Sequence, residues 1–310
     1  MTLYEAMSAA CDAVGICVPQ RTAPGVWAQS PVIGKKASNR SGRVLIFDDQ
    51  RGGIAKNYAT GIEERFSVSG ESQTVFSDKE RAEIARRRRE KAERAELEQK
   101  AVAQICAEIV RTCRPETHPY LERKGFPEEV GLVHDDPRKH FPANRLGERL
   151  MHSMMEFDAP LLIVPGRIGK TVTTLQFIRD DGEKKNILRG KMDGACHRIA
   201  TGRETWVAEG FATGLTIRAA LGRLGRSATV LCGFSASNVE KVAKNHPYSI
   251  IAADNDKPVA QFDGQGTGEF YARRSGHVWT MPPNVEQDFN DFQSEEGLRA
   301  VALHLKGVRT

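Results

Sequence analysis

The chain has 310 residues, of which 40% are apolar and 27% charged, a balance that is ordinary for a soluble globular protein with room for more than one domain. No stretch approaches about eighteen uncharged apolar residues, which argues against a transmembrane helix, and the acidic start at Glu5 is unlike a signal peptide. We therefore expect a cytoplasmic protein without a membrane partner. The net charge of +5 is weak evidence for a polyanionic partner, and the six cysteines include no C-x-x-C pair of the kind found in zinc ribbons.

Residues 1–76 are rich in glycine and turn signals, with short strand-like runs such as residues 43–47, and this pattern predicts a small β-rich module. Its aromatic residues Trp27, Phe47 and Tyr58 could stack on unpaired bases. Packing in the core of the module is the interpretation we favour for each of them, because neither zinc cysteines nor regularly spaced basic residues accompany them.

Residues 77–114 are highly charged and end before Pro115, and they predict one long helix of about 36 residues, roughly 54 Å in length. Ser77 and Glu80 have the spacing of a capping box at its start. The run "ARRRREKAER" could bind nucleic acid, but the interleaved glutamates favour i to i+4 ion pairs on a solvated connector helix.

Residues 115–200 predict a mixed α+β subdomain, with strands at 159–166 and 172–179 and a hairpin turn at Asp181 and Gly182. The segment "GRIGKT" lacks the first glycine of a phosphate loop, because position 164 is Val164, and we interpret it as a hairpin turn.

Basic residues outnumber acidic ones between residues 167 and 191. Four of them could receive a nucleoside triphosphate or the primer-template backbone, and a solvated hairpin face is the alternative. They are Lys184, Lys185, Arg189 and Lys191.

Residues 201–310 alternate strand-like and helix-like segments, which predicts a doubly wound parallel sheet. The expected strands lie at 205–208, 228–233, 249–253 and 277–281, and the expected helices at 211–224, 238–244 and 268–274.

Three acids follow two of these strands. Glu209 comes directly after the strand at 205–208, and Asp254 and Asp256 come directly after the strand at 249–253. Carboxyl ends of parallel strands meet at one edge of a sheet, where open α/β sheets keep their ligands. Three acids there repel one another unless a cation such as Mg²⁺ neutralises them, so the pattern points to metal-dependent phosphoryl chemistry. Capping of the following turn is the structural alternative for the two aspartates.

This pattern resembles a Toprim domain, whose signature is a Glu after the first strand and an Asp-x-Asp after the third. The blocks "HPYLERKGF", "LQFIRDDGEKKNILRGKMDGACHRI", "VAEGFATGLTI", "IIAADND" and "QDFNDF" occur in the order found in Toprim DNA primases of phages and conjugative plasmids. The resemblance covers about residues 115–293. It implies an α/β Toprim domain at 201–310, preceded by a basic primase subdomain at 115–200, a connector helix at 77–114 and a template-binding module at 1–76 that lacks the zinc-ribbon cysteines.

The function implied by the resemblance is synthesis of short RNA primers on single-stranded DNA from nucleoside triphosphates, with Mg²⁺ or Mn²⁺ as cofactor. A replicative helicase or other plasmid or phage replication proteins are further partners that it suggests. Glu209, Asp254 and Asp256 would be catalytic and bind metal. Asp288 could add a metal contact and Asp291 could support it, although such residues after proline also form turns.

Two alternatives stay open. A Toprim nuclease would hydrolyse phosphodiesters with the same acids, and a non-catalytic replication factor would keep the fold as a platform for nucleic acid. A topoisomerase is excluded, because none of the five tyrosines lies in a region large enough to form the strand-passage gate.

Overall fold

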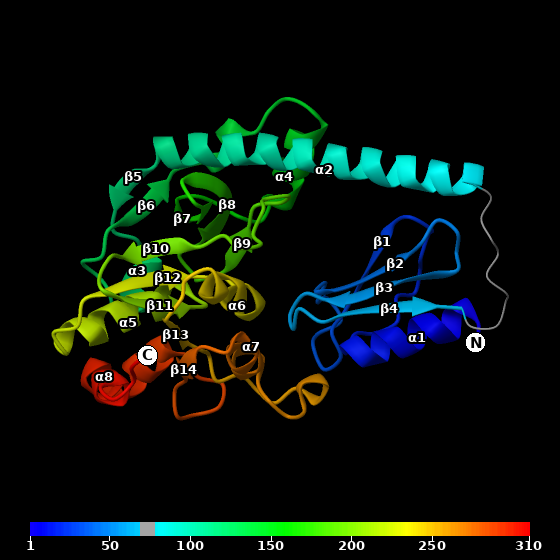
Figure 1. Cartoon of the computed structure of the whole chain (residues 1–310). Helices are drawn as coiled ribbons and strands as arrows, with labels where there is room; N and C mark the ends of the chain where they lie inside the picture. Colours follow the sequence, from blue (N-terminus) through cyan, green and yellow to red (C-terminus); the bar gives the residue numbers. More distant parts are fainter. Residues whose placement is uncertain (69–77) are drawn as a thin grey trace. The chain divides into compact units, whose positions relative to one another are not determined.

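The computed structural model describes residues 1–68 and 78–310, and the chain divides into two compact units (Figure 1). The first consists of Met1–Glu83 together with Pro258–Gln265, and the second of Ile84–Lys257 together with Gly266–Thr310. The capping box expected at Ser77 lies outside the described residues.

The first unit is a four-stranded antiparallel sheet with one helix on one face. The strands follow one another in space in chain order: β1 (Trp27–Ser30), β2 (Gly42–Ile46), β3 (Gly52–Asn57) and β4 (Glu63–Ser67). Helix α1 (Leu3–Val14), which the sequence analysis missed, begins with a capping box between Thr2 and Glu5. Its apolar face packs on the inward side chains of the sheet, Val44, Ile46 and Phe66 among them.

The other face of this sheet is open to solvent. Trp27 and Tyr58 are 42% and 59% exposed, so the prediction that they pack in the core is wrong. Trp27 is exposed because side chains alternate between the two faces of the sheet, and Trp27 lies on the face opposite the buried Val44 and Ile46. Phe47 is partly buried.

Helix α2 (Asp78–Thr112) confirms the expected long charged helix, with i to i+4 ion pairs such as Arg86–Glu90 and Arg89–Glu93. The expectation of a solvated connector is wrong for its C-terminal half. Val102, Cys106 and Ile109 recur at helical spacing and are fully buried in the core of the second unit.

The second unit contains an antiparallel sheet whose five strands also follow chain order. These are β5 (Arg114–Glu116), β6 (Gly131–His134), β7 (Leu161–Ile168), β8 (Thr171–Ile178) and β9 (Lys184–Asn186). The short helices beside them are α3 (Pro119–Arg123), η1 (Pro137–His140) and α4 (Arg145–Ser153). Both expected hairpins are confirmed: Gly169 (φ +60°) lies in the turn between β7 and β8, and Gly182 (φ +88°) in the turn between β8 and β9.

The third sheet has the order β10-β12-β11-β13-β14. Its strands are β10 (His197–Ala200), β11 (Glu204–Ala208), β12 (Ala228–Cys232), β13 (Ser249–Ala252) and β14 (Val278–Thr280). Strands β11 to β14 are parallel, as expected, whereas the unpredicted β10 runs antiparallel to β12 at the edge.

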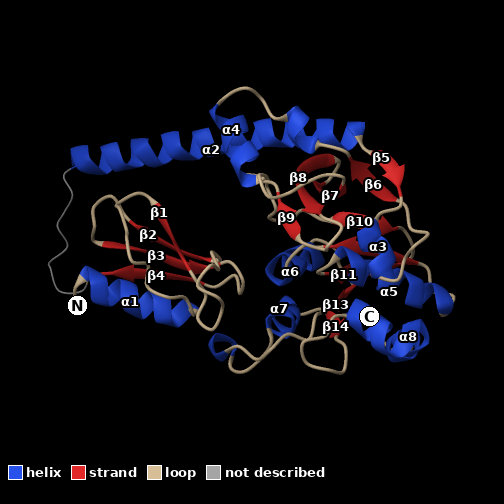
Figure 2. Cartoon of the chain, turned by 180° about the vertical axis from the view of Figure 1, so that it is seen from behind, coloured by secondary structure: helices blue, strands red, loops and turns tan. Residues whose placement is uncertain are grey.

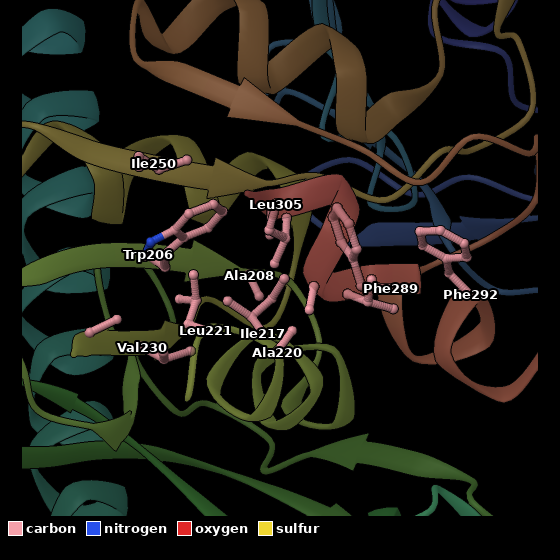
Figure 3. Close-up of a cluster of buried hydrophobic side chains, with 14 residues drawn as sticks. Trp206, Ala208, Ile217, Ala220, Leu221, Val230, Ile250, Phe289, Phe292 and Leu305 are labelled. Carbon is pink, nitrogen blue, oxygen red and sulfur yellow. The ribbon is translucent and has the colours of Figure 1, made fainter. Parts of the chain in front are cut away.

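Helices cover both faces of this sheet. They are α5 (Phe211–Arg223), α6 (Ala236–Lys244), α7 (Thr267–Ser275) and α8 (Phe289–Leu305), with η2 (Ala260–Phe262) in the first unit. Trp206, Ala208 and Ile250 pack against α5 and α8 (Figure 3), and α5 and α8 lie side by side (Figure 2). Val207 and Ile251 point the other way, toward α6 and α7. Successive side chains of these apolar strands point to opposite faces of the sheet, so both faces are apolar and both are covered by helices.

Candidate acid site at the sheet edge

The three acids of the sequence motif lie at the same edge of the third sheet. Glu209 directly follows β11, and Asp254 and Asp256 follow β13, which is the parallel neighbour of β11 with Ala208 opposite Ala252. The shared edge is therefore the carboxyl edge that the sequence indicated.

Glu209 lies between β11 and α5 in the chain and contacts the loop that precedes α6. Its backbone carbonyl accepts a hydrogen bond from the Phe234 amide (2.9 Å), and the Ala236 amide at the start of α6 favours the charged form of its carboxyl group. Burial raises the pKa of Glu209 to about 7, with Asp256 adding to the rise and Lys184 opposing it. Near neutral pH this carboxyl group is poised between its charged and neutral forms.

Asp254 has the most unfavourable surroundings of the three acids. Its Oδ1 atom is buried and has no hydrogen-bond partner. Burial raises the pKa of Asp254 well above its usual range, and the charges of Glu209, Asp288 and Asp256 raise it further. A buried carboxylate oxygen without a partner is costly to the fold, which favours a functional reason for its presence.

Asp256 has a structural contact as well. Its Oδ2 atom accepts a hydrogen bond from the Gly268 amide (2.8 Å) in the first turn of α7, a helix whose N-cap is Gly266, so this contact is with a segment twelve residues further along the chain and not with the turn after the strand. Gly266 and Gly268 pack on the acid loop, because a Cβ atom on Gly268 would lie 2.3 Å from the Asp254 carbonyl oxygen and one on Gly266 2.5 Å from that of Asp256. These two glycines are thus required by close backbone approach, which the sequence analysis did not foresee.

Asp288 is the N-cap of α8. Its Oδ1 atom accepts hydrogen bonds from the amides of Asn290 (2.6 Å) and Asp291 (2.8 Å), and Asp291 completes a capping box. Asp291 also pairs with Lys124 at 3.7 Å. The turn-forming alternative therefore describes both residues, while the charge of Asp288 still contributes to the raised pKa of Glu209 and Asp254.

The donor chemistry of the acids fits a hard divalent cation. All donors are carboxylate oxygens, one of them orphaned, and a cation would offset their mutual repulsion. Within residues 1–68 and 78–310, however, no three His, Cys, Asp or Glu side chains are grouped so that they could hold a metal ion together. Magnesium does not need three such ligands, because it usually binds through one or two carboxylates and completes its shell with water and substrate phosphates.

The four basic residues that the sequence suggested for phosphate binding do not share one set of contacts. Lys184 acts on Glu209 and Asp254 electrostatically, and its Nζ atom lies 5.6 Å from the centroid of the Tyr120 ring. Lys185, next on the strand, has its Nζ atom 5.2 Å from the Phe157 ring, which belongs to another buried cluster.

The other two basic residues face α2 or are held through the backbone. Arg189, with a positive φ of 66°, forms an ion pair with Glu98 of α2 at 3.3 Å. The amide of Lys191 donates to the carbonyl of Thr173 (2.9 Å). Of the four residues, Lys184 is therefore the one whose charge acts on the acids. The contacts of the other three do not assign them a role.

Two proteins that are similar in sequence to this chain are DNA primases. Over 261 residues the chain is 27% identical to a DNA primase TraC of Escherichia coli, and over 258 residues it is 28% identical to a second DNA primase TraC of that organism. The resemblance to plasmid-type primases is confirmed. The matches cover 78% and 76% of this chain but only 22% and 16% of the two primases, so the chain spans about a fifth of their length.

Two other comparisons add less. No protein-family model matches the chain. The primase fragment of the bacteriophage T7 primase-helicase protein aligns with 90% of this chain and 100% of its own, at a TM-score of 0.38 and 12% identity, which is too distant to support the fold. In the part of the chain that the structure describes, no helix combines the length and apolar character that crossing a bilayer requires.

Proposed function

We propose that this chain is a primase that joins ribonucleotides into short primers on single-stranded DNA, with a Toprim-type acid site formed by Glu209, Asp254 and Asp256. The observation that carries the proposal is the placement of these acids after two adjacent parallel strands, where burial, followed by the charges of neighbouring acids, raises the pKa of Glu209 and Asp254. The similarity to DNA primases supports the reaction class.

Primer synthesis joins the 3′-hydroxyl of one nucleotide to the α-phosphate of the next, so two phosphate-bearing partners must be held together. Mg²⁺ or Mn²⁺ bound at the acids would supply charge stabilisation at the reacting oxygens. Asp254 and Asp256 would hold the cation, and Glu209, with a pKa near neutrality, could ligate it or accept the proton of the attacking hydroxyl. Asp288 would tune the charge of the site from the start of α8.

Lys184 is proposed to bind the triphosphate beside these acids, because its charge already acts on Glu209 and Asp254. Lys184→Ala is expected to raise the KM for nucleoside triphosphates by roughly tenfold to a hundredfold, the effect of one charge-assisted contact. Lys185→Ala is the matched control, since its side chain contacts Phe157 instead. Steady-state kinetics with equal effects in the two variants would contradict the assignment.

The open face of the first sheet is proposed to bind the template. Trp27 and Tyr58 are exposed there, and the Tyr58 ring carries Lys56 Nζ at 5.2 Å and the Arg43 guanidinium at 5.8 Å. Aromatic rings with adjacent cations are the usual platform for single strands.

Trp27→Ala and Tyr58→Ala are each expected to weaken binding of an oligothymidylate by about fivefold to a hundredfold, since stacking contributes about 1–3 kcal/mol per base. Tyr4→Ala is the control, because Tyr4 is equally exposed (64%) but lies on α1, at the opposite face. Fluorescence anisotropy at fixed salt measures the three affinities. An equal loss in the Tyr4 variant would remove the open face from the proposal.

The direct test is incorporation of labelled ribonucleotides by the full chain on single-stranded DNA with Mg²⁺ or Mn²⁺, while the template is checked for cleavage. Short labelled products that require the metal would support the primase. Metal-dependent loss of template without products would identify a nuclease, and DNA binding without either reaction would identify a non-catalytic platform.

A further inference from the structure

Three polar side chains meet where α2 ends. The Oγ1 atom of Thr112 lies 3.0 Å from Nε2 of His134 and 3.0 Å from Nε2 of His140, and the two Nε2 atoms are 3.1 Å apart. The rings stand edge to face, with centroids 5.2 Å apart. Thr112 belongs to the last turn of α2, His134 to β6 and His140 to η1, so this histidine clasp, as we call it, joins three elements.

The hydrogen bonds fix the tautomers of the clasp. The Asp136 amide donates to Nδ1 of His134 (3.0 Å), so that nitrogen carries no proton and the proton of neutral His134 is on Nε2. Nε2 of His140 can then accept it. The Thr112 hydroxyl has the carbonyls of Glu108 (3.0 Å) and Ile109 (3.1 Å) as its own acceptors. The contact between the two Nε2 atoms therefore has room for a single proton.

A second proton would put two N–H groups face to face at about 3.1 Å, which replaces a hydrogen bond by repulsion. His134 is only 8% exposed, so water cannot easily replace the lost bond.

Nearby charges compensate a cationic ring only in part. Of the acids, Glu108 on α2 pairs with Arg111, Asp135 pairs with Arg114 of β5, and Asp136 pairs with Arg138 of η1. Asp135 and Asp136 favour protonation of His134, whereas burial, His140 and Lys139 of η1 disfavour it.

We propose that the histidine clasp is a proton-sensitive joint, which ties the last turn of α2 to β6 and η1 while both rings are neutral and opens when the pair takes up a proton. The inference is independent of the proposed function. Burial, followed by His140, lowers the pKa of His134 in the folded chain. The stability that the clasp contributes is therefore present above the unfolded value, about 6.5, and is lost as the pH falls below it.

A two-histidine metal site is the competing interpretation, because about 3 Å is also the separation of two nitrogen ligands on one transition metal. It requires lone pairs on both Nε2 atoms. The amide of Asp136 at Nδ1 of His134 places a proton on one of them instead.

Hydrogen exchange on the full chain at pH 7.5 and pH 5.5, corrected for the intrinsic rate, tests the joint. Amide protection of residues 109–116 and 131–141 is expected to fall by up to about tenfold at the lower pH, because that pH is one pKa unit below the unfolded histidine value and the joint opens with one proton. In His140→Gln, which keeps an acceptor but removes one titrating ring, the loss of protection at the lower pH should be clearly smaller than in the wild type, with His134 as the remaining titrating group of the clasp. His152→Gln, an exposed histidine on α4, should behave like the wild type.

The proposal fails if protection in the wild type does not change with pH or if His140→Gln loses it as the wild type does. Added Zn²⁺ that increases protection of these segments would establish the metal site instead. Ring ¹⁵N chemical shifts in the wild type decide the matter even if the variant does not fold, because an Nδ1 of His134 that carries a proton at pH 7.5 would contradict the tautomer on which the joint depends.

Discussion

Asp254→Asn is expected to reduce primer synthesis by roughly a thousandfold or more, the scale seen when a single preorganised group at a reacting charge is removed. The same change should raise thermal stability. Asparagine has nearly the same shape, and it removes an acid whose ionisation is opposed by burial and then by the charges of Glu209, Asp288 and Asp256. An acid kept for function and not for the fold has this signature, namely loss of activity with a gain in stability.

Asp158→Asn is the matched control, because Asp158 is 87% exposed and its guanidinium neighbour Arg138 lies 4.0 Å away. It should leave both the melting temperature and the rate of incorporation near the wild-type values. Thermal unfolding without metal and ribonucleotide incorporation with Mg²⁺ measure the two effects on the same preparations. A less stable Asp254→Asn would mean that the carboxylate is structural, and an active one would remove Asp254 from the proposed site.

The parallel sheet of the second unit was predictable because its strands are apolar on both faces. Runs such as Thr205–Ala208 have no alternation, so they indicate strands covered by helices on two sides, and the acids that follow them must then share an edge. Elements without such a signal were missed. Helix α8 contains Gly297 at φ +84°, which interrupts its pattern, and β10 carries His197 and Arg198 where an apolar run would be expected.

The surroundings of the acids depend on contacts between distant segments, which sequence patterns do not encode. Lys184 and Lys185 are neighbours in the chain, yet the pleat of β9 sends them to different surroundings, Tyr120 for one and Phe157 for the other. Likewise, the exposure of Trp27 depends on α1 covering the opposite face of the first sheet. The residue types allowed either outcome, and tertiary packing decided between them.

The largest effect on stability is expected for Arg226→Ala. The guanidinium of Arg226, 7% exposed, binds both carboxylate oxygens of Glu204, including Nε to Oε1 at 2.9 Å, and donates to the carbonyls of Leu305 and Val308 at 2.9 Å each. It also lies 5.6 Å from the centroid of the buried Trp206 ring. One side chain therefore ties the amino end of β11 to the end of α8.

Removal of Arg226 leaves a partly buried carboxylate and two carbonyls without their donor, which costs about 3–5 kcal/mol and lowers the melting temperature by roughly 10 °C. Arg223, the last residue of α5, is exposed, and Arg223→Ala should change the melting temperature by at most a degree or two. Arg226 precedes β12 and so lies at the amino edge of the sheet, opposite the acids. Below its melting transition, Arg226→Ala should therefore synthesise primers at the wild-type rate. Calorimetry that finds the two arginine variants equally stable would show that the link between β11 and α8 does not contribute to stability as the structure indicates.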